Sequence, residues 1–93
     1  MKMTEAKKYI RIIQGWELAR NAKSIERKLV FKDFKHALRF VNNVGAIAEK
    51  EGHHPDILLH SWNKVNIRLS THAIKGLSIN DFILAAKIDR ISG

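Results

Sequence analysis

The chain has 93 residues, of which 45% are hydrophobic and 28% are charged, and its formal net charge at pH 7 is +8. This length and this ordinary globular composition predict one domain over residues 1–93 and argue against a disordered chain. Because cysteine is absent, disulfide frameworks, thiolate nucleophiles and cysteine zinc sites are excluded. The start of the chain lacks the apolar core of a signal peptide, and no run of residues suits a membrane helix. We therefore expect a cytoplasmic location.

The first predicted element is an amphipathic helix over residues 4–14. Its apolar residues recur at spacings of three and four and would share one face: Ala6, Tyr9, Ile10 and Ile13. Gly15 supplies a stop for this helix. Two short antiparallel strands, 16–20 and 24–31, are predicted to follow around a turn.

A long helix is predicted next, because Asp33 is a good N-cap and apolar residues then keep helical spacing for about five turns. Gly52 ends this helix, and the proline that follows cannot continue it. Residues 57–70 predict a second hairpin that turns at Asn63-Lys64. Its second strand alternates apolar and polar residues, which gives one buried and one polar face.

A last helix is predicted from the capping-box pattern of residues 78–81, Ser-Ile-Asn-Asp. The predicted order is therefore helix, hairpin, helix, hairpin, helix. Two hairpins can join into one antiparallel sheet that carries the helices on a single face. We predict a two-layer α+β fold, in which a four-stranded antiparallel sheet carries three helices in the order α-β-β-α-β-β-α.

The densest chemical signal is the segment 49–55, Glu-Lys-Glu-Gly-His-His-Pro, between the long helix and the second hairpin. Its glycine permits unusual backbone dihedrals, and Pro55 restricts His54 to extended conformations. This pattern predicts a rigid corner that carries two imidazoles. Glu49 stands one helical turn before His53, so we expect this carboxylate and this imidazole to pair.

His72 has a different setting, at the end of a strand and near the start of the last helix. A positive charge is favoured at the carboxyl end of a helix, close to His53, and disfavoured at the amino end, close to His72. Imidazoles biased in opposite directions are a candidate acid and base. We therefore predict that His53, His54 and His72 form the working site; the alternative is that they are hydrogen-bonding linkers at chain corners.

Other residues have simpler explanations when their spacing alone is considered. Asp81 suits the N3 position of a helix cap better than a catalytic role, and Trp62 in a hairpin is more often a packing residue. A zinc site is the weaker chemical alternative, because Glu-x-x-x-His is not a zincin motif and no second histidine stands at i,i+4 from His53. We predict no metal site.

Several motifs stand in the order and spacing of a known family over about half of the chain: Glu49-x-x-x-His53-His54-Pro55, Trp62, Ser70-Thr71-His72, Gly76-Leu77-Ser78 and Asp81. In these motifs the sequence resembles the pterin-4a-carbinolamine dehydratase family. The resemblance implies the fold predicted above. It also implies a hydro-lyase that dehydrates a 4a-hydroxytetrahydropterin to the quinonoid dihydropterin in tetrahydrobiopterin recycling, with no metal or organic cofactor.

The resemblance also implies roles for individual residues. The three active-site histidines of the family map onto His53, His54 and His72. Contacts with the pterin substrate are implied for Glu49, Pro55, Trp62, Ser70, Thr71 and Asp81. Water loss needs an acid for the leaving hydroxyl and a base for the N5 proton. We predict His53 or His54 as the acid, and His72 as the base or as a group that orients the pterin.

The expected partners follow from the same resemblance and from the charge. Members of the family are oligomers, so we expect a homodimer or a homotetramer, with no membrane partner. Some animal members serve as dimerisation cofactors for a homeodomain transcription factor, and a basic chain could hold nucleic acid nonspecifically. We favour an ordinary solvated surface over a nucleic-acid site, because the charge is spread along the chain rather than gathered in one stripe. The enzyme is therefore preferred to the binding role. A dehydratase-like protein for a molybdenum-cofactor pterin is the third possibility.

Overall fold

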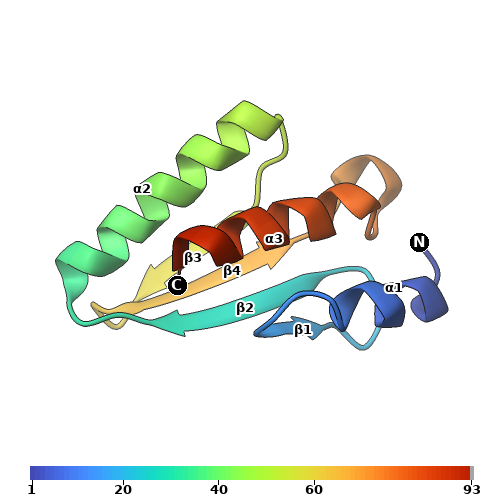
Figure 1. Ribbon diagram of the computed structural model, residues 1–93, viewed down its shortest axis with the longest axis horizontal. Coiled ribbons are helices and arrows are strands. Elements are labelled where there is room, and N and C mark those ends of the chain that lie inside the picture. The colour runs from blue at the N-terminus through green and yellow to red at the C-terminus, as the bar shows by residue number, and fades with distance from the viewer. Residues whose placement is uncertain (93) are drawn as a thin grey trace.

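A computed structural model of the protein describes residues 1–92, which form an α+β fold. The elements are α1 (Met3–Ile10), β1 (Trp16–Leu18), β2 (Ile25–Val30), α2 (Phe34–Glu51), β3 (Asp56–His60), β4 (Lys64–Leu69), the 3₁₀ helix η1 (His72–Ile74) and α3 (Ile79–Ser92). The strands form one antiparallel sheet in the order β1-β2-β4-β3, and Figure 1 shows α2 and α3 on the same side of it. The predicted fold and element order are confirmed.

The core lies between the central strands and the helices. The inward side chains of β2 and β4 alternate with outward ones, and four of them are fully buried: Ile25, Val65, Ile67 and Leu69. α2 and α3 bury small and large apolar residues at helical spacing against them: Ala37, Phe40, Val44, Ala48, Phe82, Leu84, Ala85 and Ile88. Each large side chain buried in this way stabilises the fold by about 2 kcal/mol. None of the helices within residues 1–92 combines the length and the apolar character that a bilayer crossing needs.

The first helix is shorter than predicted. α1 ends at Ile10 rather than at residue 14, because the chain turns there and the Ile12 N–H donates to the Tyr9 carbonyl at 3.0 Å. Ile13 is nevertheless buried, since the turn brings it to the core. The apolar spacing predicts the buried face correctly, but burial at position 13 does not need a helix. The ring of Tyr9 packs on Phe82, with centroids 5.3 Å apart, which attaches α1 to α3.

The sequence predicts the turn of the second hairpin at Asn63-Lys64, which is correct for Asn63 and wrong for Lys64. Lys64 begins β4, and the turn is made by residues 61–63, with Ser61 and Trp62 in the left-handed region at φ 50° and 58°. Asn63 is held elsewhere: its carbonyl accepts from the Phe31 N–H at 2.8 Å, and its amide Nδ2 donates to the Phe31 carbonyl at 2.9 Å. This attachment to the end of β2 determines where β4 can begin.

Both predicted ends of α2 are confirmed. Asp33 is the N-cap, and its Oδ1 accepts from the His36 N–H at 2.8 Å. This backbone hydrogen bond, helped by the His36 imidazole, holds the pKa of Asp33 below its usual value of 3.8. At the other end Gly52 has φ 63°, the left-handed conformation that ends many helices.

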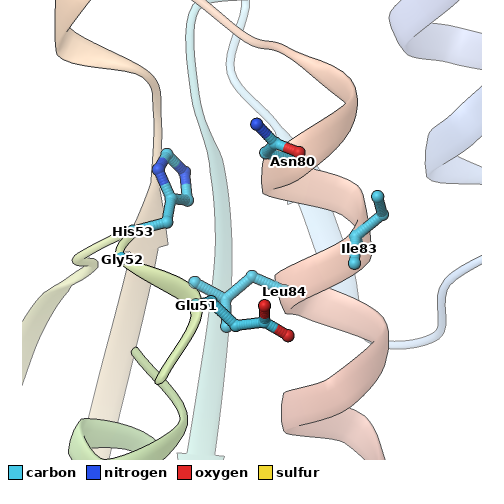
Figure 2. A pocket seen from close by; sticks show the side chains of 6 residues that line it. All are labelled: Glu51, Gly52, His53, Asn80, Ile83 and Leu84. Carbon is cyan, nitrogen blue, oxygen red and sulfur yellow. The ribbon is translucent and has the colours of Figure 1, made fainter. Parts of the chain in front are cut away.

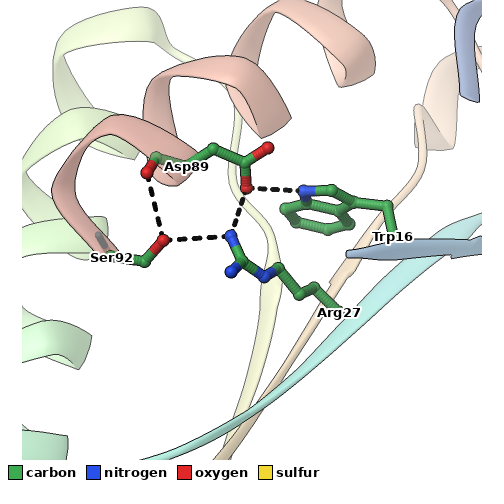
Figure 3. A network of polar contacts seen from close by, with 4 residues as sticks. All are labelled: Trp16, Arg27, Asp89 and Ser92. Carbon is green, nitrogen blue, oxygen red and sulfur yellow. Dashed lines mark hydrogen bonds and ion pairs between the residues drawn. The ribbon is translucent and has the colours of Figure 1, made fainter. Parts of the chain in front are cut away.

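A polar cluster joins the carboxyl end of α3 to the first two strands (Figure 3). The indole N–H of Trp16 donates to Asp89 Oδ1 at 2.8 Å, and Arg27 Nη1 donates to the same oxygen at 2.5 Å. Arg27 also donates to Ser92 Oγ at 3.0 Å. These bonds fix the end of α3 over β1 and β2. Their donors, the Trp16 indole and the Arg27 guanidinium, are groups that donate but do not accept.

Candidate active site

The end of α2 fixes the backbone of His53. The His53 N–H donates to the Ala48 carbonyl at 3.1 Å, across the left-handed Gly52. This is the hydrogen-bond pattern of a glycine-terminated helix, in which the residue after the glycine leaves in a defined direction. The corner predicted from the Gly and Pro residues is therefore present.

The two adjacent imidazoles point in different directions. His53 turns inward: its Nε2 lies 2.5 Å from Asp81 Oδ1, and its side chain is 18% exposed. His54 turns outward, is 63% exposed, and contacts Glu49 Oε2 through its own Nε2. The expectation that Glu49 pairs with His53 is wrong. Gly52 directs His53 toward α3, and the next side chain on extended backbone points to the opposite side, back over the end of α2.

Asp81 is the centre of the cluster around His53, and it is fully buried. Its Oδ2 accepts from the Thr71 hydroxyl at 2.8 Å and from the Ser78 N–H at 3.0 Å, while its Oδ1 faces His53. The bond from the Ser78 N–H is the capping-box bond that the sequence predicts for this position. A buried carboxylate needs partners of this kind. Asp81 therefore caps α3 and orients the His53 ring at the same time.

His72 lies on a short loop that Thr71 and Gly76 close. The Thr71 N–H donates to the Gly76 carbonyl at 2.7 Å, and the return bond from the Gly76 N–H is 3.3 Å long. Between them the chain forms the 3₁₀ helix η1, which the sequence does not predict, and His72 is exposed on it. The loop thus carries His72 next to the residue that donates to Asp81.

Two cavities are lined by residues of this region. The smaller one, about 120 Å³, lies between the end of α2 and the start of α3, and Figure 2 shows His53 across from α3, which contributes Asn80, Ile83 and Leu84 to the lining. The larger one, about 340 Å³, is lined mainly by polar and charged residues: Lys23, Ser24, Asp56, Arg68, Ser70, Thr71, His72, Lys75 and Gly76. Of the two, the larger falls within the range of about 300–1,000 Å³ that ligand sites occupy.

The predicted site residues gather at one end of the sheet, with one exception. His53 lines the smaller cavity, and Thr71 and His72 line the larger one. Asp81 joins the two cavities, because it is bonded to both Thr71 and His53. Ser70 lies with His72, the Glu49–His54 pair stands at the outer end of α2, and Pro55 leads into β3.

Trp62 is the exception. It is exposed between β3 and β4, at the opposite end of β3 from the two histidines. Figure 1 shows this tip of the β3–β4 hairpin beside the start of α2. Its neighbour Asn63 is bonded to Phe31, which fixes the tip there. Within one chain, Trp62 does not join the histidines.

Sequence reasoning missed the cationic residues of the larger cavity and the contact of Asn80 with the smaller one. Lys23, Arg68 and Lys75 carry no local motif, and only the fold brings them together. Within residues 1–92, no three histidine, aspartate or glutamate side chains are grouped so that they could hold a metal ion.

Comparison with known proteins identifies the family. A family model described as "Pterin 4 alpha carbinolamine dehydratase" matches residues 1–91. The chain belongs to the pterin 4 alpha carbinolamine dehydratase family. It is 52% identical over 87 residues to a protein of Alkaliphilus metalliredigens (strain QYMF), covering 92% of this chain and 77% of that one. It is 48% identical over 90 residues to one of Azoarcus sp. (strain BH72), covering 97% and 76%; both are provisionally named pterin-4-alpha-carbinolamine dehydratase.

Solved structures agree with this assignment to the pterin carbinolamine dehydratase family. The "transcriptional coactivator/pterin dehydratase" of Brucella melitensis matches with a TM-score of 0.92 and 31% identity, covering 100% of this chain and 98% of that one. A pterin dehydratase-like protein described as a RuBisCO assembly factor in the alpha-carboxysome matches with a TM-score of 0.72 over 86% of this chain and 92% of that one. At 21% identity, the second match shows the fold alone. The family resemblance inferred from the motifs is confirmed.

Proposed function

We propose that this protein is a hydro-lyase that removes water from a 4a-hydroxytetrahydropterin to give the quinonoid dihydropterin, as in tetrahydrobiopterin recycling. The observation that carries the proposal is the imidazole of His53, held 2.5 Å from a buried carboxylate that is itself bonded to Thr71 on the wall of the larger cavity. A histidine oriented by a buried aspartate is a common arrangement for proton transfer.

The elimination requires two proton transfers and no other reagent. The C4a hydroxyl is protonated and leaves as water, the N5 proton is taken by a base, and the C4a–N5 double bond forms. With Asp81 as the acceptor, Nε2 of His53 carries a proton and Nδ1 remains for exchange with the substrate. We assign the acid role to His53 in preference to His54, because the ring of His54 is more exposed and its partner Glu49 lies at the surface.

His72 is proposed as the base, or as a group that orients the pterin. It lines the larger cavity beside Ser70 and Thr71, where polar atoms for a flat heterocycle are available. The physiological pterin, the cytoplasmic location and a homodimeric or homotetrameric state stay predictions from the sequence.

The test is a stopped-flow assay on a synthetic 4a-hydroxytetrahydropterin with His53, His54 and His72 replaced by Ala one at a time. A proton-transfer residue contributes about 10²-fold or more in rate, so we expect losses of that size for His53 and His72 and a smaller loss for His54. His36→Ala is the matched control, since this imidazole pairs with Asp33 at the start of α2 and should leave the rate unchanged. Nearly full rates in all three site variants would end the proposal.

A further inference from the structure

The larger cavity carries more positive charge than a neutral pterin requires. Three of its lining residues are cations, Lys23, Arg68 and Lys75, and among residues 1–92 Asp56 is its one lining carboxylate, which leaves an excess of two positive charges. The cations come from three separate segments: the β1–β2 loop, strand β4 and the end of η1. Charges that converge on a hollow from separate segments attract an anion more strongly than the same charges spread over a flat surface.

The charge of the two lysines is not neutralised by neighbours. The charge of Arg68 is partly compensated by acidic neighbours, because its Nη2 lies 3.6 Å from Glu26 Oε2 and its position on β4 is opposite Asp56 on β3. By contrast, no ion pair involving Lys23 or Lys75 is found among residues 1–92. Two lysines that form no ion pair within residues 1–92 therefore line the same cavity as one arginine whose charge is partly compensated.

The cations adjoin the candidate catalytic groups. The Lys75 N–H donates to the His72 carbonyl at 3.1 Å, so both residues leave the same tight turn. Arg68 lies near the end of β4, two residues before Ser70, which follows the strand, and Thr71 then connects the cavity to Asp81. A ligand whose ring lies beside Thr71 and His72 would extend its substituent toward the cationic part of the cavity.

Resting on the proposed function, we propose that the substrate is a 4a-hydroxytetrahydropterin whose C6 side chain carries a phosphate monoester, and that Lys23, Arg68 and Lys75 bind that phosphate. A phosphate monoester has a charge of about −1.5 to −2 at neutral pH and several strong acceptor oxygens. Lysine supplies compact charge and arginine supplies planar donors for such a group, and Ser24 lines the same cavity.

The test compares two matched substrates, the 4a-hydroxytetrahydropterin with a C6 hydroxymethyl group and its phosphate monoester. Wild type is expected to have a kcat/KM for the phosphorylated compound about tenfold or more above that for the neutral one. In the Lys23→Gln/Lys75→Gln double variant this preference is expected to fall to near unity. The Lys32→Gln/Lys35→Gln double variant removes two exposed lysines near the start of α2, and it is expected to keep the wild-type preference.

Each other outcome overturns the inference in a recognisable way. Turnover of both substrates without preference in wild type would reject the phosphate and leave the dehydratase intact. Turnover of neither would contradict the proposed function, and the inference with it. Salt-sensitive oligonucleotide binding that the Lys23/Lys75 variant alone weakens, with no substrate preference in wild type, would assign these cations to nucleic acid. Thermal melts of both double variants check that they fold.

Discussion

Helix α3 is attached to the rest of the molecule by an aspartate near each end, and the two attachments differ in kind. Asp89 accepts from an indole and a guanidinium, which are donors only, and its side chain is 21% exposed. Asp81 is 0% exposed and faces an imidazole, whose ring nitrogens can each donate or accept a proton. The partner, rather than the carboxylate, decides whether such an attachment can take part in proton transfer.

The two aspartates also differ in which segments of the chain supply their donors. The donors at Asp81 come from the end of α2, the residues after β4 and the cap of α3 itself, so three segments meet at one side chain. Within residues 1–92, the side-chain donors to Asp89 come from β1 and β2. Removal of either carboxylate is expected to destabilise the fold, but only removal of Asp81 is expected to disorder the candidate site.

The largest expected effect is that of Asp81→Ala. Three donors lose their acceptor in a buried place, so we expect the free energy of unfolding to fall by about 3 kcal/mol and dehydration to be lost. Urea denaturation and the stopped-flow assay measure the two quantities. Asp81→Asn keeps an acceptor oxygen and removes the charge, so it is expected to fold while its kcat falls about 10²-fold. A fully active Asp81→Asn would show that the charge facing His53 is not needed.

Asp89→Ala is the counterpart at the other end of α3. It removes the acceptor of the Arg27 and Trp16 bonds in a partly exposed place, so we expect a loss of about 1.5 kcal/mol in the free energy of unfolding. The rate of dehydration per folded molecule is expected to match wild type. A loss of dehydration rate at a temperature where the variant is folded would contradict the view that Asp89 supports stability alone while Asp81 also supports the site.

Two glycines extend the comparison to the backbone. At Gly15, φ is +82° and an added Cβ would lie 2.9 Å from Arg27 Nε, so Gly15→Ala strains the backbone and also displaces the partner of Asp89. At Gly52, φ is +63° but an added Cβ meets nothing within 4 Å. We expect Gly15→Ala to cost about 2 kcal/mol and Gly52→Ala about 1 kcal/mol of stability. Thermal melts in the opposite order would argue against the Arg27 contact.

The smallest expected effect concerns Asp33, which lies away from both attachments. Its pKa is lower in the folded chain than the usual 3.8, chiefly through the His36 N–H, so its carboxylate stabilises the fold above that pH. The contribution is lost as the pH falls through the lower folded value. Asp33→Asn is therefore expected to melt slightly below wild type at neutral pH, and the difference should shrink below pH 3.8. An unchanged difference in acid would contradict the assigned cause.

The sequence predicts the features that depend on local chemistry. Asp33, Gly52 and the Ser78–Asp81 box define helix ends through bonds within a few residues, and each lies where it was predicted. The partner of His53 could not be predicted in this way, because Asp81 is 28 residues away and the local spacing rule indicates Glu49 instead. The Trp16–Asp89 bond spans 73 residues and carries no local signal either.

The double use of Asp81 makes the assembly of the site and the formation of the first turn of α3 a single cooperative event. When that turn opens, the Ser78 amide loses its acceptor at the moment when the Thr71 hydroxyl and the His53 ring lose theirs. Hydrogen exchange at the Ser78 amide therefore reports directly on how often the site falls apart. On heating, we expect activity to fade with the fraying of this one helical turn, while the sheet beneath it is still folded.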